Sequence, residues 1–166
     1  MSPAKTVFQI IRDEHAAVSA VLRAMARLIE RGPGDAPEDF FDRLRAMLFY
    51  IDEFPERRHH PKESDLLFPK IVRHLPELMP VIRRLETDHL QGEGRVRELQ
   101  HLLLAWELLG EPRREAFEQA AQTYLRFYLD HMRVEEVQLL PVAERELPRE
   151  VVAELDVAFR GHSDPL

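Results

Sequence analysis

The chain has 166 residues, of which 45% are hydrophobic and 32% are charged, and it contains only 6 glycines. This length and composition indicate one compact, largely helical domain and exclude a disordered or fibrous chain. The net charge of −7 and the scattered Lys and Arg residues argue against binding to nucleic acid. Because cysteine is absent, disulfides, thiolate nucleophiles and iron–sulfur clusters are excluded, and any metal must be held by imidazole and carboxylate groups.

The sequence carries no targeting or membrane signal. The first fifteen residues include acidic side chains and lack the continuous apolar region of a signal peptide. No apolar run approaches the ~20 residues of a membrane span. We therefore expect a soluble, cytoplasmic protein that does not associate with a membrane.

Core-type residues recur at spacings of three and four from Phe8 to Ile29, which predicts a long amphipathic helix. His15 lies on its buried side. The glycines and prolines of residues 31–37 end this helix, and Pro37 is suited to open the next one. The second helix is predicted to carry Phe40, Phe41, Leu44, Leu48 and Ile51 inward.

Two prolines interrupt the second helix. Pro55 lies inside an otherwise helical pattern, and Pro61 follows His59 and His60. A proline inside a helix removes one hydrogen bond and favours a kink or a break. We therefore predict an irregular segment over residues 59–70.

A third helix is predicted to begin between Pro76 and Pro80 and to end at Leu109, with His89 and Glu93 on its inner side. The fourth helix shows core-type spacings from Phe117 to Glu135. A short fifth helix after Pro148 is predicted to cover one end of the molecule.

Long amphipathic helices joined by short loops predict an all-α fold, an antiparallel up-down-up-down four-helix bundle. We expect a single domain over residues 1–166, with the bundle at about 6–145 and the C-terminal helix at about 148–160. The centre of such a bundle is a place where facing helices build metal sites.

Each of the four long segments carries a histidine at an interior position. Three have a glutamate four residues later, which places an imidazole and a carboxylate on one helix face: His59 with Glu63, His89 with Glu93, and His131 with Glu135. Chance would give about one such pair in this composition. Taken singly, each is more often a core histidine or a surface ion pair, but burying the whole set without a ligand would be costly. His74, His101 and His162 lack this pattern, and we expect no role for them.

The motif HHPKESDLLFP over residues 59–69 is specific. Together with Asp13-Glu14-His15 before it and the segment from His131 to Pro141 after it, it resembles the hemerythrin-like HHE cation-binding family over roughly residues 6 to 145. The resemblance implies a non-haem centre of two iron ions, with manganese or zinc as substitutes. It implies imidazole ligands at His15, His59, His89 and His131, and carboxylates that bridge the two metals at Glu63 and Glu135. His60 is either a further ligand or a hydrogen-bond donor beside the metals.

One position departs from the oxygen-carrying hemerythrins, which have a second histidine where this chain has Glu93. A glutamate ligand would add negative charge and favour the ferric state, so we expect a centre that reacts instead of carrying oxygen reversibly. The alternative is that Glu93 is a solvent-facing acid.

These observations predict a protein that binds or reacts with oxygen, peroxide or nitric oxide, or senses iron. The alternatives are an enzyme that turns over peroxide or nitric oxide, and a metal-free helical bundle that binds a partner. The expected partner is a small diatomic or peroxide ligand, and the sequence leaves self-association and an unknown protein partner open. Tyr124 or Tyr128 is a candidate hydrogen-bond donor near the metals.

Overall fold

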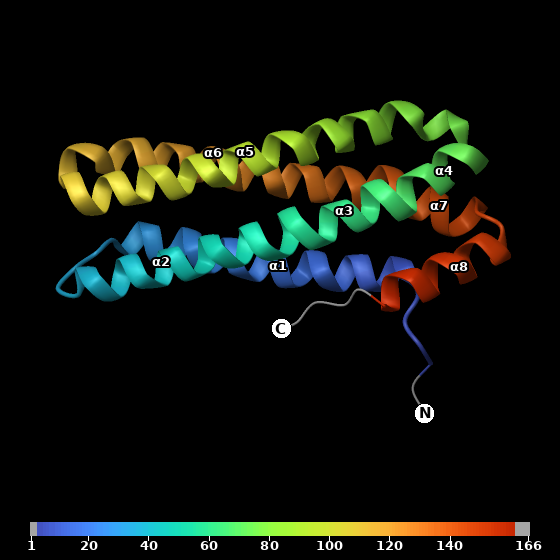
Figure 1. Cartoon of the computed structure of the whole chain (residues 1–166), viewed down its shortest axis with the longest axis horizontal. Helices are drawn as coiled ribbons and strands as arrows, with labels where there is room; N and C mark the ends of the chain where they lie inside the picture. The colour runs from blue at the N-terminus through green and yellow to red at the C-terminus, as the bar shows by residue number, and fades with distance from the viewer. Residues whose placement is uncertain (1–2, 162–166) are drawn as a thin grey trace.

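The computed structural model describes residues 3–161, which form helices and contain no strand. The α-helices are α1 (Val7–Arg31), α2 (Pro37–Ile51), α3 (His60–Lys62), α4 (Phe68–His74), α5 (Met79–Leu109), α6 (Arg114–Val134), α7 (Leu140–Glu146) and α8 (Arg149–Arg160). Helices α2 to α4 follow one another along one rod of the bundle, and α6 and α7 along another (Figure 1). With α1 and α5 they make the predicted all-α bundle of four rods, confirming the fold class.

Local sequence explains where α1 begins and ends. The side chain of Thr6 accepts a hydrogen bond from the backbone of Gln9, and the Gln9 side chain accepts one from the backbone of Thr6. This reciprocal pair satisfies amide groups that the first helical turn leaves free. At the other end Gly32 adopts a φ of 73°, which glycine tolerates without steric cost, and its N–H caps the last turn.

The second rod does not break at its prolines, and the irregularity predicted over residues 59–70 takes the form of π-helical turns within a continuous helix. The chain continues through π-helical turns at Asp52–His59 and Glu63–Leu67. The N–H of His60 donates a hydrogen bond to the carbonyl of Pro55, five residues back. In the same way the N–H of Phe68 donates to the carbonyl of Glu63. Proline has no backbone N–H to donate, and the wider π-helical turn accommodates Pro55 and Pro61. The rod therefore stays helical.

A polar layer separates two hydrophobic clusters along the bundle. The first is built on Leu22, Leu44 and Trp106, towards the end where α1 meets α2. The second is built on Phe8, Ile71 and Phe159, and there the predicted C-terminal helix α8 lies against α1 (Figure 1). Each cluster shields one side of the polar layer from water.

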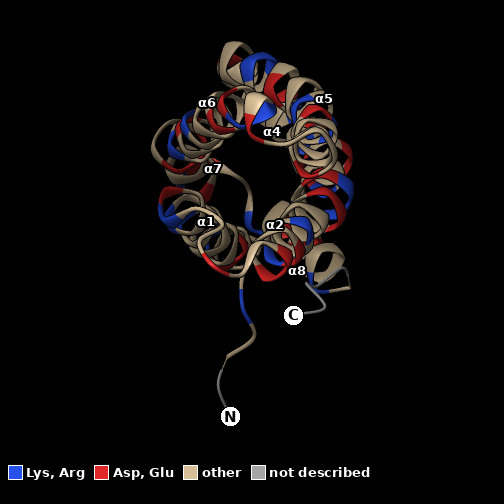
Figure 2. Ribbon diagram, turned by 90° about the vertical axis from the view of Figure 1, so that its left-hand side faces the viewer, with Lys and Arg blue, Asp and Glu red and all other residues tan. Residues whose placement is uncertain are grey.

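Most charged side chains of the described residues lie on the outer faces of the bundle, and the buried exceptions are Glu14, Glu56, Lys62, Glu63 and Glu135. In the view along the bundle, α1, α2, α5 and α6 surround a common axis, and acidic and basic residues are spread over the outside (Figure 2). No described helix is both long enough and apolar enough to cross a membrane.

Candidate metal centre

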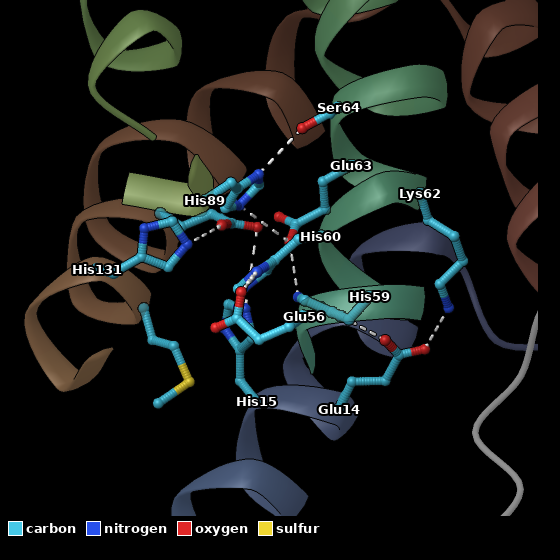
Figure 3. Close-up of polar contacts among 12 residues, drawn as sticks. Glu14, His15, Glu56, His59, His60, Lys62, Glu63, Ser64, His89 and His131 are labelled. Atoms are coloured by element: carbon cyan, nitrogen blue, oxygen red, sulfur yellow. Dashed lines mark hydrogen bonds and ion pairs between the residues drawn. The ribbon is translucent and has the colours of Figure 1, made fainter. Parts of the chain in front are cut away.

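All four rods deliver imidazoles to the polar layer, where the donor atoms form two neighbouring groups (Figure 3). One group is His60, His89 and His131, and the other is His15, His59, Glu63 and Glu135. Within each group the donor atoms lie within 4.8 Å of one another, and every residue is buried. Either group can hold a metal ion.

The two carboxylates lie between the groups. Oε1 of Glu63 lies 2.6 Å from Nε2 of His59 and 3.9 Å from Nε2 of His89. Glu135 directs one oxygen to each side, with Oε1 3.9 Å from His15 and Oε2 3.7 Å from His131. Each carboxylate thus faces both groups, as a bridging ligand would.

Four of the imidazoles are oriented by a partner on the outer side of the ring. The Nδ1 atoms contact Glu136 (3.2 Å from His15), Glu14 (His59), Ser64 (3.0 Å from His89) and Asp88 (3.0 Å from His131). Glu136, Glu14 and Asp88 are carboxylates, which accept hydrogen bonds, so in His15, His59 and His131 Nδ1–H donates and Nε2 faces inward. Outer partners of this kind fix the tautomer of metal-binding histidines.

Nine buried side-chain atoms of the described residues make no hydrogen bond, and they gather in this layer; two of them, His59 Nε2 and Glu63 Oε1, are in ion-pair contact with each other. They are Glu56 Oε2, His59 Nε2, His60 Nδ1, both carboxylate oxygens of Glu63 and of Glu135, His89 Nε2 and His131 Nε2. A buried polar atom left unsatisfied costs about 1–3 kcal/mol. Such a concentration of unpaired nitrogen and oxygen donors fits a bound metal, which would satisfy them together.

Burial and neighbouring charge shift the pKa values in opposite directions. Burial by itself would raise the pKa of Glu63, but the His59 imidazole outweighs it and the pKa falls to about 2. Burial likewise opposes the charged form of His59, whereas Glu63 and Glu14 together raise its pKa to about 9. Burial lowers the pKa of His89 to about 3. Without metal the layer thus contains a His59–Glu63 ion pair beside a neutral His89, and a metal must displace the His59 proton.

The carboxylate behind His59 is shared with a buried lysine. Nζ of Lys62 lies 2.6 Å from Oε1 of Glu14, while the other oxygen of Glu14 contacts His59 (Figure 3). Although burial opposes ionisation, these two partners hold the pKa of Glu14 below its usual value. Glu14 is therefore an anion neutralised by Lys62 on one side and by His59 on the other.

His60 joins the three-imidazole group in the opposite ring orientation. Its Nε2 lies 3.0 Å from the hydroxyl of Tyr128, and its unpaired Nδ1 lies 3.4 Å from Oε2 of Glu56. The ring stacks on His89 with the centroids 4.0 Å apart. The sequence left two roles for His60, a metal ligand or a hydrogen-bond donor beside the metals, and its position next to His89 and His131 favours the ligand. Tyr128, one of the two candidate tyrosines, lies beside the centre as expected.

Glu93 is not brought into either group, contrary to its predicted place on the inner side of the third helix. Its side chain is 48% exposed and pairs with Arg97 at 2.5 Å. In α5, Glu93 is rotated about 40° to one side of His89 and Gly92 about 60° to the other, and the packing of the helix turns the Gly92 side inward. Glu63 and Glu135, at the same spacing from His59 and His131, are buried instead, each at the start of a π-helical turn.

Several side chains of this layer were not predicted from the sequence. They are the outer partners Glu14, Ser64, Asp88 and Glu136, and the buried Glu56. Only Glu56 had a usable signal, because it precedes His60 by four residues. His74 and His101 are exposed, and His162 lies outside the described residues.

The comparison with protein families agrees with the motif. A family model described as the hemerythrin HHE cation binding domain matches residues 6–143, which include every candidate ligand above. No curated protein sequence gave a significant match. Most of the chain is therefore covered by one cation-binding domain, and the protein belongs to the hemerythrin HHE family.

Proposed function

We propose that the chain holds two iron ions in this layer and binds oxygen, peroxide or nitric oxide there. The observation that supports this is the set of five buried imidazoles and two buried carboxylates in two adjacent groups, most of which have an atom without a hydrogen-bond partner. A tetrahedral zinc site uses four ligands, so seven donors exceed what one such ion needs. Facing helices of a bundle are a common setting for paired iron ions.

The two groups are unequal, and this inequality suggests where an external ligand would bind. The ion beside His60, His89 and His131 would have three imidazoles, whereas the ion beside His15 and His59 would have two. With the carboxylates shared, the second ion keeps more positions free. Bound iron would supply redox chemistry and an affinity for small diatomic ligands.

The surrounding side chains orient the donors and exclude water. The outer carboxylates hold His15, His59 and His131 with Nε2 directed inward. Aromatic rings shield the layer: Phe68 stacks on His89 at 5.6 Å, and Phe54 lies 6.2 Å from His59. A dry, preorganised site strengthens every electrostatic interaction within it.

The position of Glu93 changes one earlier expectation. Reaction with oxygen was favoured over reversible carriage because a glutamate ligand would add negative charge at that position. Since Glu93 is exposed and paired with Arg97, it supplies no charge as a ligand and that argument no longer holds. Reversible carriage of oxygen and irreversible reaction with oxygen are then distinguished by exposing the diferrous protein to oxygen and removing it again.

The experiment is anaerobic reconstitution with ferrous iron, a count of iron per chain, and exposure to air in a stopped-flow spectrometer. We expect two ions per chain and a rapid spectral change on adding oxygen. Recovery of the diferrous spectrum after removal of oxygen would indicate carriage, and a persistent oxidised spectrum would indicate reaction. Sustained turnover of peroxide or nitric oxide would establish the enzymatic alternative. A chain that binds no metal would overturn the proposal and favour a partner-binding bundle.

A further inference from the structure

Glu56 is a buried carboxylate beside the three-imidazole group that neither the motif nor the family match assigns. It is 7% exposed, and its Oε1 accepts a hydrogen bond of 3.1 Å from the hydroxyl of Tyr124. Its Oε2 has no hydrogen-bond partner. Tyr124 thus holds one oxygen and leaves the other free. All the other unpaired buried atoms of the described residues belong to candidate ligands.

The free oxygen of Glu56 faces the free nitrogen of His60 (Figure 3). Oε2 and Nδ1 lie 3.4 Å apart, and Tyr128 occupies the other nitrogen of the ring. Metal–nitrogen and metal–oxygen bonds of about 2.1 Å separate two neighbouring ligand atoms by about 3.0–3.4 Å. The spacing therefore suits Glu56 and His60 as ligands of one ion, and because Glu56 lies outside the group in which the donor atoms of His60, His89 and His131 are mutually within 4.8 Å, its carboxylate would move towards that ion on binding.

The opposite helix leaves room for this carboxylate. A Cβ at Gly92 of α5 would lie 2.8 Å from Oε1 and 3.2 Å from Oε2 of Glu56. Any side chain at this position would displace the carboxylate. By contrast, a Cβ at Gly94 would meet nothing within 4 Å. The glycine at 92 is thus matched to the presence of Glu56.

We propose that Glu56 is a further metal ligand that binds, through Oε2, the ion held by His60, His89 and His131. This inference rests on the proposed metal centre. It gives the three-imidazole ion an anionic donor from the rod that packs next to α5, in place of the one that Glu93 was expected to supply. The competing explanation is that Glu56 only orients His60 by a hydrogen bond.

The test uses Glu56→Gln, which keeps the size of the side chain and an oxygen that can accept from Tyr124 but removes the anion. Metal-free protein is titrated with cobalt(II) against a competing chelator, and the oxygen and nitrogen ligands per ion are counted by X-ray absorption. We expect one of the two ions to bind about 10- to 100-fold more weakly and to lose an oxygen ligand. Gly92→Ala should shift both readouts in the same direction, and Gly94→Ala should match the wild type.

The outcomes separate the ligand from a positioning role. Weaker binding with an unchanged set of ligand atoms would mean that Glu56 only orients His60, and would overturn the inference. Unchanged affinity in Glu56→Gln would overturn it as well. If the wild type binds a single ion and Glu56→Gln still removes an oxygen ligand, the paired centre fails but the role of Glu56 stands. A wild type that binds no ion would overturn both.

Discussion

His60 and Tyr128 form a hydrogen bond of 3.0 Å that turns the imidazole of His60 around relative to the other buried histidines. The others use Nδ1 for an outer partner and direct Nε2 inward, whereas His60 uses Nε2 for Tyr128 and leaves Nδ1 unpaired. Its ring thereby joins the three-imidazole group. The centre thus gains its fifth imidazole from the second rod, next to His59.

The carboxylates between the two groups should matter more for metal content than any other acid. Glu63→Ala or Glu135→Ala removes a donor that faces both groups, so we expect the loss of most of the metal. Glu93→Ala should keep the wild-type content, because that side chain pairs with Arg97 at the surface. Replacing His60 should lower the metal content less than replacing Glu63 or Glu135. Replacing the exposed His74 should leave the metal content unchanged. Elemental analysis after reconstitution gives the counts, and equal losses in all the variants would contradict the assignment.

The outer partner of His131 should tune metal affinity without being a ligand. Asp88→Asn cannot hold the Nδ1–H tautomer as firmly, so we expect about 10- to 100-fold weaker binding. Asp130→Asn is the matched control, since Asp130 pairs with Arg84 on the surface. Competition with a chelator measures both affinities. Similar affinities for the two variants would show that the His131–Asp88 contact does not prepare the site.

The stability of the metal-free protein should depend on pH through the ionisation of Glu56. Burial is the main cause that raises the pKa of Glu56 from 4.5 to about 8. A raised folded-state pKa means that the folded chain holds the proton more tightly than the unfolded chain. This contribution to stability is complete below pH 4.5 and is lost as the pH rises towards 8. Glu56→Gln lacks the ionisable group, so metal-free Glu56→Gln should gain about 2–4 kcal/mol over the wild type between pH 4.5 and 8. Urea unfolding at several pH values tests this, and parallel curves would refute it.

The buried lysine should contribute far more to stability than an exposed one. Lys62→Met removes the lysine from Glu14 and leaves the buried carboxylate paired with His59, and we expect a loss of about 3 kcal/mol in the metal-free protein. Lys5→Met breaks the exposed pair with Asp13 and should cost less than about 1 kcal/mol. Chemical unfolding of the two variants gives the comparison. A cost for Lys62→Met as small as that for Lys5→Met would mean that Glu14 takes up a proton or water instead.

Much of this molecule follows from local pattern. Apolar spacings of three and four define the helices and place His15, His89 and His131 on buried faces. Cysteine-free composition restricts any metal to nitrogen and oxygen ligands. The pairing of His59 with Glu63 and of His131 with Glu135 identifies the carboxylates, because neighbours on one helix face are set by the chain itself.

The tertiary structure decided what spacing could not. Glu93 has the same spacing as Glu63 but lies outside, because the packing of α5 turns Gly92 inward and leaves Glu93 at the surface with Arg97. Glu56 lies beside the centre only because Gly92 of another helix leaves space for it. The outer partners Asp88 and Glu14 reach their histidines from 43 and 45 residues away. Such contacts depend on how the rods pack, and helical periodicity describes each rod alone.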